Sequence, residues 1–355
     1  MNLKHYTFSF GKYQNKNVIW IDFPYSFQRK EELKKRYPSA KWNPENKKWY
    51  LPDFPCIRRE LKLPEKQEYP TQAGKIHPVN QEALKKFIEQ LQLKAYSKHT
   101  IKLYVYEFSK LLIALKSTDV NTLTPERLKN YFLYCLKKHK LKESSMNSKI
   151  NAVKFYYEHV LHQPKMFFDI PRPKKPLLLP KTLNKTEIAK LFKVTKNQKH
   201  LLILKLCYGM GLRVSEIVNI KIEHIDSDNM LVLIKGAKGK KDRYTNLPFS
   251  VLEPMREYYK KFRPKEWLFE GQYGGQYSVR SVQAIFKKAM KKAGIHKTIG
   301  IHGLRHSYAT HLIESGADIR FIKELLGHHS IRTTEIYTNV TDISKSKIKS
   351  PLDNF

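Results

Sequence analysis

The chain has 355 residues, and its 67 lysines and arginines against 32 acidic residues give a formal net charge of +35. A hydrophobic share of 41% supplies enough apolar side chains for packed cores and argues against wholesale disorder. The excess of positive charge favours a polyanion such as nucleic acid as the partner, with a merely lysine-rich, solvated surface as the simpler alternative.

The cysteines and the N-terminus indicate the compartment. Cys56, Cys135 and Cys207 lie far apart and form no CxxC pair, which argues against a disulfide framework and against a zinc site. The first residues, MNLKHYTFSF, lack the apolar core of a signal peptide, and no apolar run is long enough to cross a membrane. We therefore expect a cytoplasmic protein without a membrane partner.

Residues 1–63 have the pattern of a small α/β unit. Alternating apolar residues predict short strands, a Lys- and Arg-rich helix over residues 26–37, and a hairpin whose Asn-Pro-Glu-Asn turn separates Trp42 from Trp49. In so small a unit, tryptophans more often form the core than stack on nucleic acid, so we predict a core role for both. A unit of this kind can bind accessory DNA sites or a partner, or be a folded appendage without a DNA role.

Helices dominate the next part of the chain. A segment over residues 64–78 with few apolar residues predicts a linker, and residues 79–170 follow with apolar residues at helical spacing. Ser97 is placed to cap one helix, and Thr124, followed by proline, another. Short connections predict a compact bundle, and a Pro-rich second linker is expected over residues 171–180.

The remaining residues, 181–355, have the pattern of a larger domain of mixed α and β structure. A Gly/Lys turn between the β-rich runs 230–234 and 243–247 predicts a hairpin. Later helices are expected over residues 278–293, 303–315, 318–327 and 330–339. The predicted fold class is therefore multidomain and mainly α, with small β elements.

Two motifs of this last domain carry basic residues that suit an anionic substrate. GLRVSE places Arg213 at a helix start and Glu216 one turn later, where the carboxylate can orient the guanidinium. KGAKGKKDR gathers several lysines at the hairpin tip, including Lys238. Each motif alone is typical of a solvated surface, but a flexible lysine can also protonate a departing alkoxide.

Two further motifs bring histidines and a tyrosine. HGLRH puts His302 and Arg305 three residues apart at a helix start, where both groups and the backbone donors favour an anion. LLGHHSIRTTEIY adds His328 and Tyr337, and the polar residues before Tyr337 indicate a ring exposed at a cleft. Metal binding is the rival interpretation of the histidines, but no carboxylate or cysteine lies at ligand spacing, so no metal is expected.

In this order, six residues resemble the active-site set of the tyrosine recombinases, the phage-integrase and Xer family: Arg213, Lys238, His302, Arg305, His328 and Tyr337. The segments around these residues, GLRVSE, HGLRHSYATHL and LLGHHSIRTTEIYT, match that family's pattern closely. Residues 79–161 resemble its core-binding domain. The family's lysine aligns best with Lys238, with Lys240 and Lys241 as alternatives. Residues 1–63 fall outside the resemblance.

The resemblance implies a transesterification at a DNA phosphodiester. Arg213 and Arg305, supported by Glu216, would meet the negative charge on the phosphoryl oxygens, and His328 would add a hydrogen bond.

Proton transfers complete the expected mechanism. Tyr337 would attack the phosphorus and form a 3′-phosphotyrosine, with His302 as the candidate base and Lys238 as the proton donor to the 5′-oxygen. Because the covalent intermediate keeps the energy of the broken ester, neither a metal nor a nucleotide cofactor is expected.

The family further implies double-stranded DNA as the partner, held in a C-shaped clamp, and a homotetramer on two DNA sites. The tail after Tyr337 would dock on a neighbouring subunit, and accessory proteins can take part. Two alternatives are a type IB topoisomerase, which relaxes one duplex, and a DNA-binding accessory protein with a decayed site. The Xer-like sequence segments and the complete set of catalytic residues favour the recombinase.

Overall fold

The computed structural model describes residues 3–64, 73–139, 141–164, 179–236, 242–272 and 274–338. The chain divides into two compact units. One consists of Met1–Ile57 together with Leu178–Phe355, and the other of Arg58–Leu177. Within the first unit, the N-terminal residues and the C-terminal residues form separate sheets. The domain boundaries expected from the sequence stay predictions.

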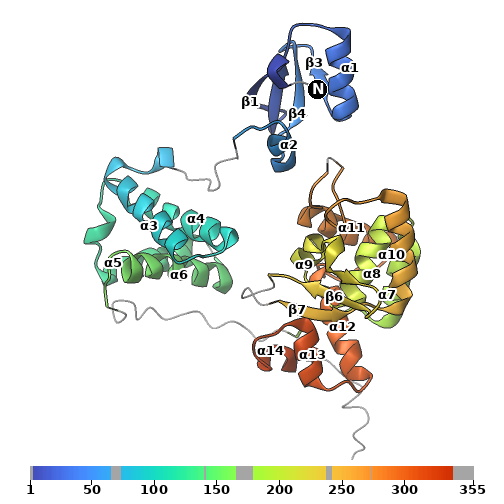
Figure 1. Cartoon of the computed structure of the whole chain (residues 1–355). Coiled ribbons are helices and arrows are strands. Elements are labelled where there is room, and N and C mark those ends of the chain that lie inside the picture. Colours follow the sequence, from blue (N-terminus) through green and yellow to red (C-terminus); the bar gives the residue numbers. More distant parts are fainter. Residues whose placement is uncertain are drawn as a thin grey trace, which may run out of the picture. The chain divides into compact units, whose positions relative to one another are not determined.

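The N-terminal residues form a four-stranded antiparallel sheet, with strand order β1-β2-β4-β3, and a helix beside it (Figure 1). Ile19, Ile21, Leu33 and Leu51 are fully buried and form the centre of this part. The elements are β1 (Thr7–Tyr13), β2 (Lys16–Asp22), α1 (Phe27–Arg36), β3 (Lys41–Asn43), β4 (Lys48–Pro52) and α2 (Pro55–Glu60). The predicted strands, helix and hairpin are therefore confirmed.

The two tryptophans of the hairpin do not both belong to the core. Trp42 and Trp49 are directly paired across β3 and β4, with ring centroids 5.7 Å apart. Trp42 is 48% exposed, so its predicted core role is wrong. The reason is that β3 is an edge strand with one neighbour, so a large ring there keeps one side in water.

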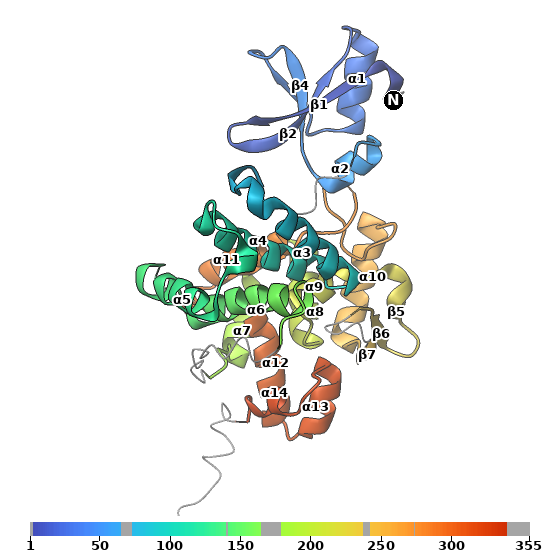
Figure 2. The same cartoon turned by 90° about the vertical axis from the view of Figure 1, so that its left-hand side faces the viewer.

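The second unit is the helical bundle predicted from the sequence (Figure 2). Its main helices are α3 (Gln81–Leu93), α4 (Lys98–Leu115), α5 (Pro125–His139) and α6 (Glu143–His159). The side chain of Ser97 caps α4 by accepting from the backbone of Thr100 at 3.1 Å, as its position predicts. Phe87 stacks on Phe108, with ring centroids 4.3 Å apart, and joins α3 to α4 in the core.

Residues 179–338 contain a three-stranded sheet and helices on several sides of it. The strands are β5 (Ile225–Asp226), β6 (Leu231–Ile234) and β7 (Arg243–Asn246), in the order β5-β6-β7. The helices are α7 (Lys185–Val194), α8 (Gln198–Gly209), α9 (Val214–Asn219), α10 (Phe249–Phe262), α11 (Val279–Lys292), α12 (His302–Glu314), α13 (Ile319–Leu326) and α14 (Arg332–Glu335). The last helix is shorter than the stretch 330–339 expected from the sequence.

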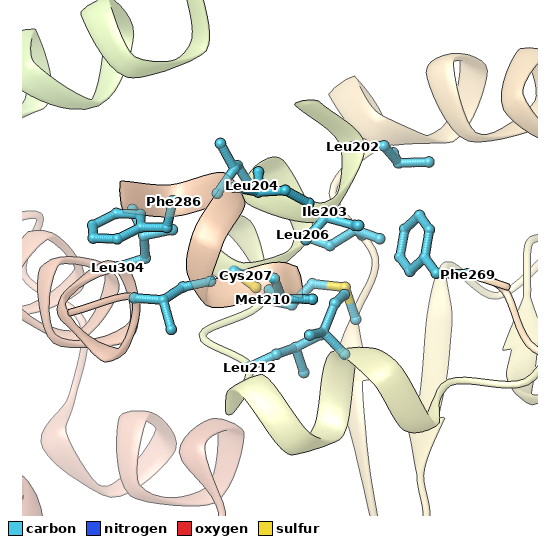
Figure 3. Close-up of a cluster of buried hydrophobic side chains, with 14 of the residues drawn as sticks. Leu202, Ile203, Leu204, Leu206, Cys207, Met210, Leu212, Phe269, Phe286 and Leu304 are labelled. Carbon is cyan, nitrogen blue, oxygen red and sulfur yellow. The ribbon is translucent and has the colours of Figure 1, made fainter. Parts of the chain in front are cut away.

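Helix α8 lies at the centre of this part. Its neighbours are α7, α9, α10, α11 and α12, and it contributes Leu202, Leu206 and Cys207 to the apolar cluster shown in Figure 3. Phe286 from α11 and Leu304 from α12 complete the same cluster. Because the end of α8 is fixed by this packing, the turn that follows it, which leads into α9, is fixed as well.

Helices α12, α13 and α14 lie beside one another at one end of this part, in both views (Figures 1 and 2). A small second core joins them, made of Ala309, Ile322, Leu326 and Tyr337. Within the described ranges of the chain, no helix is long and apolar enough to cross a membrane.

Candidate active site

A buried carboxylate on α9, that of Glu216, lies among three arginines. Its Oε1 accepts hydrogen bonds from Arg213 at 2.7 Å and from Arg243 at 2.9 Å. Its Oε2 accepts from Arg243 at 2.9 Å and from the backbone N–H of Arg213 at 2.8 Å. The Arg305 guanidinium lies 3.7 Å from the same oxygen. The predicted pairing of Arg213 with Glu216 is thus part of a larger cluster.

The charge of this cluster favours an anionic ligand. Burial by itself raises the pKa of the Glu216 carboxyl, but the hydrogen bonds and charges of Arg243 and Arg213 outweigh it and lower the pKa to about 2. The carboxylate is therefore ionised at neutral pH. One negative charge among three guanidinium groups leaves an excess of two positive charges at this place.

Three consecutive carbonyl groups at the C-terminal end of α13 hold the same arginines. Leu325 accepts from Nε of Arg243 at 3.0 Å, Leu326 from Arg305 at 2.5 Å, and Gly327 from Arg213 at 3.3 Å. Cations are favoured at this end of a helix because its last carbonyls have no partner within the helix. The end of α13 therefore orients all three guanidinium groups.

Arg305 is the most deeply buried of the three, with 1% of its surface exposed. It also donates to the carbonyl oxygen of Gly211 at 2.7 Å. Burial, followed by the charge of Arg213, lowers the pKa of its guanidinium to about 10, so it stays protonated at neutral pH.

Glycines shape the two turns that supply these carbonyl groups. Gly211 and Gly327 have φ angles of 58° and 61°, in the left-handed region that side chains rarely adopt. A Cβ atom on Gly211 would lie 2.5 Å from a ring carbon of Tyr308, and one on Gly327 would lie 2.9 Å from Cδ of Arg243. Both turns therefore require glycine.

Arg243 was not among the predicted site residues. The sequence placed it with the solvated basic residues of the hairpin, but it lies at the centre of the cluster. Alternation along β7 carries the signal that could have found it: Tyr244 is 61% exposed and Thr245 is 1% exposed, so Arg243 shares the inward face with Thr245.

The histidine predicted to be the base lies near two arginines of the cluster. His302 is the first residue of α12 and its side chain is exposed. Desolvation of its ring and the charges of Arg305 and Arg213 lower its pKa, which agrees with the predicted proximity of His302 and Arg305. Its ring centroid lies 4.6 Å from that of His306, one turn further along the helix.

Tyr337 is buried, with 1% of its surface exposed, and the prediction that its ring is exposed at a cleft is wrong. The turn after α14 folds the ring back onto α12 and α13, where it packs with Ala309, Ile322 and Leu326. The phenolic oxygen lies 2.9 Å from Nδ1 of His306. Burial raises the pKa of the phenol, against the opposing effect of the nearby arginines.

The ring of His328 lies near the tyrosine ring. The two rings are nearly parallel, with 16° between their planes and centroids 6.4 Å apart. Nδ1 of His328 is hydrogen-bonded to the hydroxyl of Thr334 at 2.9 Å. Burial and the charges of Arg305 and two further arginines lower the pKa of His328 to about 4, so the ring is neutral at neutral pH.

The structure thus brings together Arg213, Glu216, His302, Arg305, His328 and Tyr337 from the predicted set. Lys238, Lys240 and Lys241 lie outside the described residues. Among the residues that are described, no three His, Cys, Asp or Glu side chains group together in a way that could hold a metal ion.

Comparison with known proteins shows the family. The phage integrase family matches residues 181–343, and the N-terminal SAM-like domain of phage integrases matches residues 83–165. The tyrosine recombinase XerA of Pyrococcus horikoshii is 37% identical over 267 residues, which are 74% of this chain and 90% of that protein. The tyrosine recombinase XerC of Leptospira interrogans is 31% identical over 287 residues, 76% and 91% of the two chains.

The chain belongs to the phage integrase family, and within it to the tyrosine recombinases. A crystal structure of a lambda integrase dimer bound to a COC′ core site has the same fold. It aligns with a TM-score of 0.61 at 15% identity, over 72% of this chain and 94% of that one. The chain is therefore a site-specific DNA recombinase in class, and residues 1–82 lie outside both family matches.

Proposed function

We propose that this recombinase cleaves and rejoins double-stranded DNA through a 3′-phosphotyrosine at Tyr337. One observation carries the proposal: the Tyr337 ring packs against Ala309 of α12 and Leu326 of α13, next to Arg305, whose guanidinium donates to the carbonyl of the same Leu326. The arginine cluster would bind the phosphodiester, and the phenol would attack the phosphorus beside it.

Arg213 and Arg305 would stabilise the transition state. As the phosphorus becomes five-coordinate, negative charge builds on the two non-bridging oxygens, and donors already in place lower its energy most. Each guanidinium has five N–H groups and uses only some of them on Glu216 and on main-chain carbonyls. His328, neutral and held by Thr334, would add a further hydrogen bond. We assign the role of base for the Tyr337 phenol to His302, which is exposed at the start of α12.

The departing 5′-oxygen needs a proton, and we assign its delivery to Lys238, with Lys240 and Lys241 as the alternatives on the same turn. The phosphotyrosine keeps the bond energy of the broken ester, so a 5′-hydroxyl from a second duplex can attack it without a nucleotide cofactor. No step of this route calls for a metal ion.

The assembly and its surroundings follow the family. We propose a homotetramer on two DNA sites in the cytoplasm, with accessory proteins as further partners. The tail expected to dock on a neighbouring subunit, residues 339–355, lies outside the described residues. The N-terminal residues 1–63 would contact accessory DNA or a partner, because the last turn of α1 carries Lys34, Lys35 and Arg36.

Covalent capture tests the proposal. A half-site suicide substrate, whose cleaved 5′ fragment diffuses away, should trap the DNA on the protein as a 3′-phosphotyrosine. Tyr337→Phe should abolish the adduct and keep DNA affinity, since the ring still fills the apolar pocket. An adduct that survives this substitution would identify a different nucleophile.

The two alternative functions are separated with the same protein. Exchange of strands between two sites on different duplexes supports the recombinase. Relaxation of a supercoiled plasmid without exchange would support the topoisomerase, and binding without any adduct would support an accessory protein.

A further inference from the structure

We propose that the N-terminal sheet binds single-stranded DNA on the face that α1 does not cover, by stacking unpaired bases on aromatic rings. The inference rests on the proposed contact of residues 1–63 with DNA and names the form of DNA that binds there. It does not involve the reaction at Tyr337. Its basis is a cluster of three rings on this face, those of Tyr13, Trp20 and Tyr50.

The two faces of this sheet differ in what covers them. Residues that are paired across antiparallel strands point to the same face. Ile19, Ile21 and Leu51 share one face and are fully buried. Trp49 is paired with Ile21, and Nζ of Lys34 from α1 lies 5.7 Å from its ring centroid. Helix α1 therefore lies on this face of the sheet (Figure 1), and the opposite face is the one proposed to bind DNA.

The opposite face carries the aromatic cluster. Trp20 is paired with Tyr50 on one side and with Ser9 on the other, and Tyr13 follows Ser9 at an even spacing along β1. The three ring centroids lie 5.1 to 6.1 Å apart. The angles between the ring planes are 53° to 70°, so no ring of the cluster is stacked in parallel on another. All three side chains are partly exposed, which leaves part of each ring open to a ligand.

A glycine lets one of these rings lie against the sheet. A Cβ atom on Gly11 would lie 2.9 Å from Cδ1 of Trp20, which is closer than side-chain contacts allow. The indole therefore occupies the space that a side chain on β1 would fill. A ring held in this way loses little freedom when a base stacks on it, so the entropic cost of binding is small.

Lysines beside the rings match the charge of a DNA strand. Lys16 and Lys41 are paired across the strands with two of the rings, so they share their face, and both are exposed. Lys48 lies on this face as well and forms an ion pair with Asp22 at 3.2 Å. Residues 1–63 contain fourteen lysines and arginines against six acidic residues. This positive charge attracts the phosphates of a strand whose bases stack on the rings.

The chemistry of this face selects unpaired bases. In a duplex, each base is covered by its neighbours, and the grooves offer only base edges and phosphates. Aromatic rings on a sheet stack on bases that have left their neighbours, which a single strand provides. Every base has a π face, so this binding depends little on sequence. We expect DNA as the strand, because the chain is a DNA recombinase in class.

The test measures the affinity of the full-length protein for labelled oligo(dT) and for a labelled duplex, by fluorescence anisotropy. Excess unlabelled duplex in the oligo(dT) experiment occupies the other basic surfaces of the chain. Trp20→Leu and Tyr50→Leu keep an apolar side chain on the sheet but remove the ring. Each should weaken oligo(dT) binding by about five- to a hundredfold, the usual contribution of one stacked base, and leave duplex binding unchanged.

A tryptophan of the other face supplies the matched control. Trp42 is paired with Trp49 and is 48% exposed, so Trp42→Leu should change neither affinity. Unchanged oligo(dT) binding in both Trp20→Leu and Tyr50→Leu would overturn the inference. An equal loss of duplex binding would also overturn it, and would leave the proposed contact of residues 1–63 with accessory DNA standing. Covalent capture at Tyr337 on a short core site should be the same in all three variants, so a failure of that proposal is seen separately.

A measurement on the unaltered protein guards against variants that fail to fold. Oligo(dT) that carries 5-iododeoxyuridine crosslinks under ultraviolet light to aromatic side chains stacked on it. With the full-length wild-type chain, mass spectrometry should find the crosslinks at Tyr13, Trp20 or Tyr50. Crosslinks confined to other parts of the chain would overturn the inference.

Discussion

The arginine side of the active site is held by charge, whereas the tyrosine side is held by neutral contacts. Arg213, Arg243 and Arg305 converge on Glu216 and on main-chain carbonyls. The hydroxyl of Tyr337 instead lies 2.9 Å from Nδ1 of His306, and its ring packs in a small apolar cluster. The segment that carries it contains the four-residue helix α14.

The difference matches what each side does in the proposed reaction. The arginines must be in place before charge develops on the phosphate, because a site that reorganises during the reaction loses part of its stabilisation. The tyrosine must form a bond to DNA, carry the strand and release it. Weak, uncharged contacts can be broken and remade with a small change in free energy. We therefore expect the arginine side, where the phosphate would bind, to be the more rigid of the two.

The largest expected effect comes from removing the charge at the centre of the arginine side. Glu216→Gln leaves one buried and two partly buried guanidinium groups without their counter-ion, and breaking a buried ion pair costs about 3–5 kcal/mol of unfolding free energy. Urea unfolding measures it. Glu223→Gln is the matched control, since Glu223 is 65% exposed and its ion pair with Lys221 is 3.7 Å long. Equal costs for the two variants would contradict the comparison.

The unfolding free energy should also depend on pH differently in the wild type and in Glu216→Gln. The folded-state pKa of Glu216, about 2, lies below its usual unfolded value, so the stabilisation is present above the unfolded pKa and is lost as the pH falls toward 2. Wild-type unfolding free energy should therefore fall between about pH 5 and about pH 2 more steeply than that of Glu216→Gln. Parallel curves would show that the carboxylate is not held by the arginines.

A smaller effect is expected from Arg243→Lys, which keeps the charge but loses the two-point contact with Glu216. The loss of a charged hydrogen bond is worth about 1.5–3 kcal/mol in unfolding free energy, and DNA cleavage should slow as well. Arg256→Lys is the control, because Arg256 is an exposed arginine of the same part of the chain. A stable but slow Arg243→Lys enzyme would show that Arg243 acts by orienting Glu216 and Arg213.

The smallest effect is expected on the tyrosine side. Thr334→Val removes the hydroxyl that holds His328 and should cost about 1 kcal/mol, one neutral hydrogen bond. Single-turnover cleavage should slow by about tenfold or less, since 1.4 kcal/mol corresponds to a factor of ten. Thr333→Val, at an exposed neighbouring position, should change neither quantity. A Thr334 variant as impaired as Glu216→Gln would mean that both sides are equally rigid.

Local signals in the sequence predicted much of the fold. Polar residues that cap helices mark their starts, and the side chains of Ser97 and Thr124 do accept the expected backbone hydrogen bonds. Helix α10 was not predicted, because Pro254 interrupts its helical pattern of apolar residues. Proline is tolerated there because the helix packs against α8. The tertiary contact outweighs the local preference.

The site was predicted as a set of residues but not as a set of contacts. The order of the motifs identified Arg305 and Tyr337, whereas nothing local indicates that Arg305 reaches Gly211, 94 residues earlier. Likewise, nothing local indicates that Nδ1 of His306 lies 2.9 Å from the phenolic oxygen of Tyr337. Burial of the tyrosine ring follows from the fold of the segment after α13, and neighbouring sequence alone favoured exposure.

The anchoring of the arginines at the end of α13 has a consequence for how the sequence can vary. Three of the acceptors are main-chain carbonyls, those of Leu325, Leu326 and Gly327, so side-chain changes at positions 325 and 326 leave them in place. What must persist is the path of the backbone, and the left-handed turn at Gly327 sets it. We expect this part of the active site to tolerate mutational drift in its side chains while remaining intolerant at one glycine.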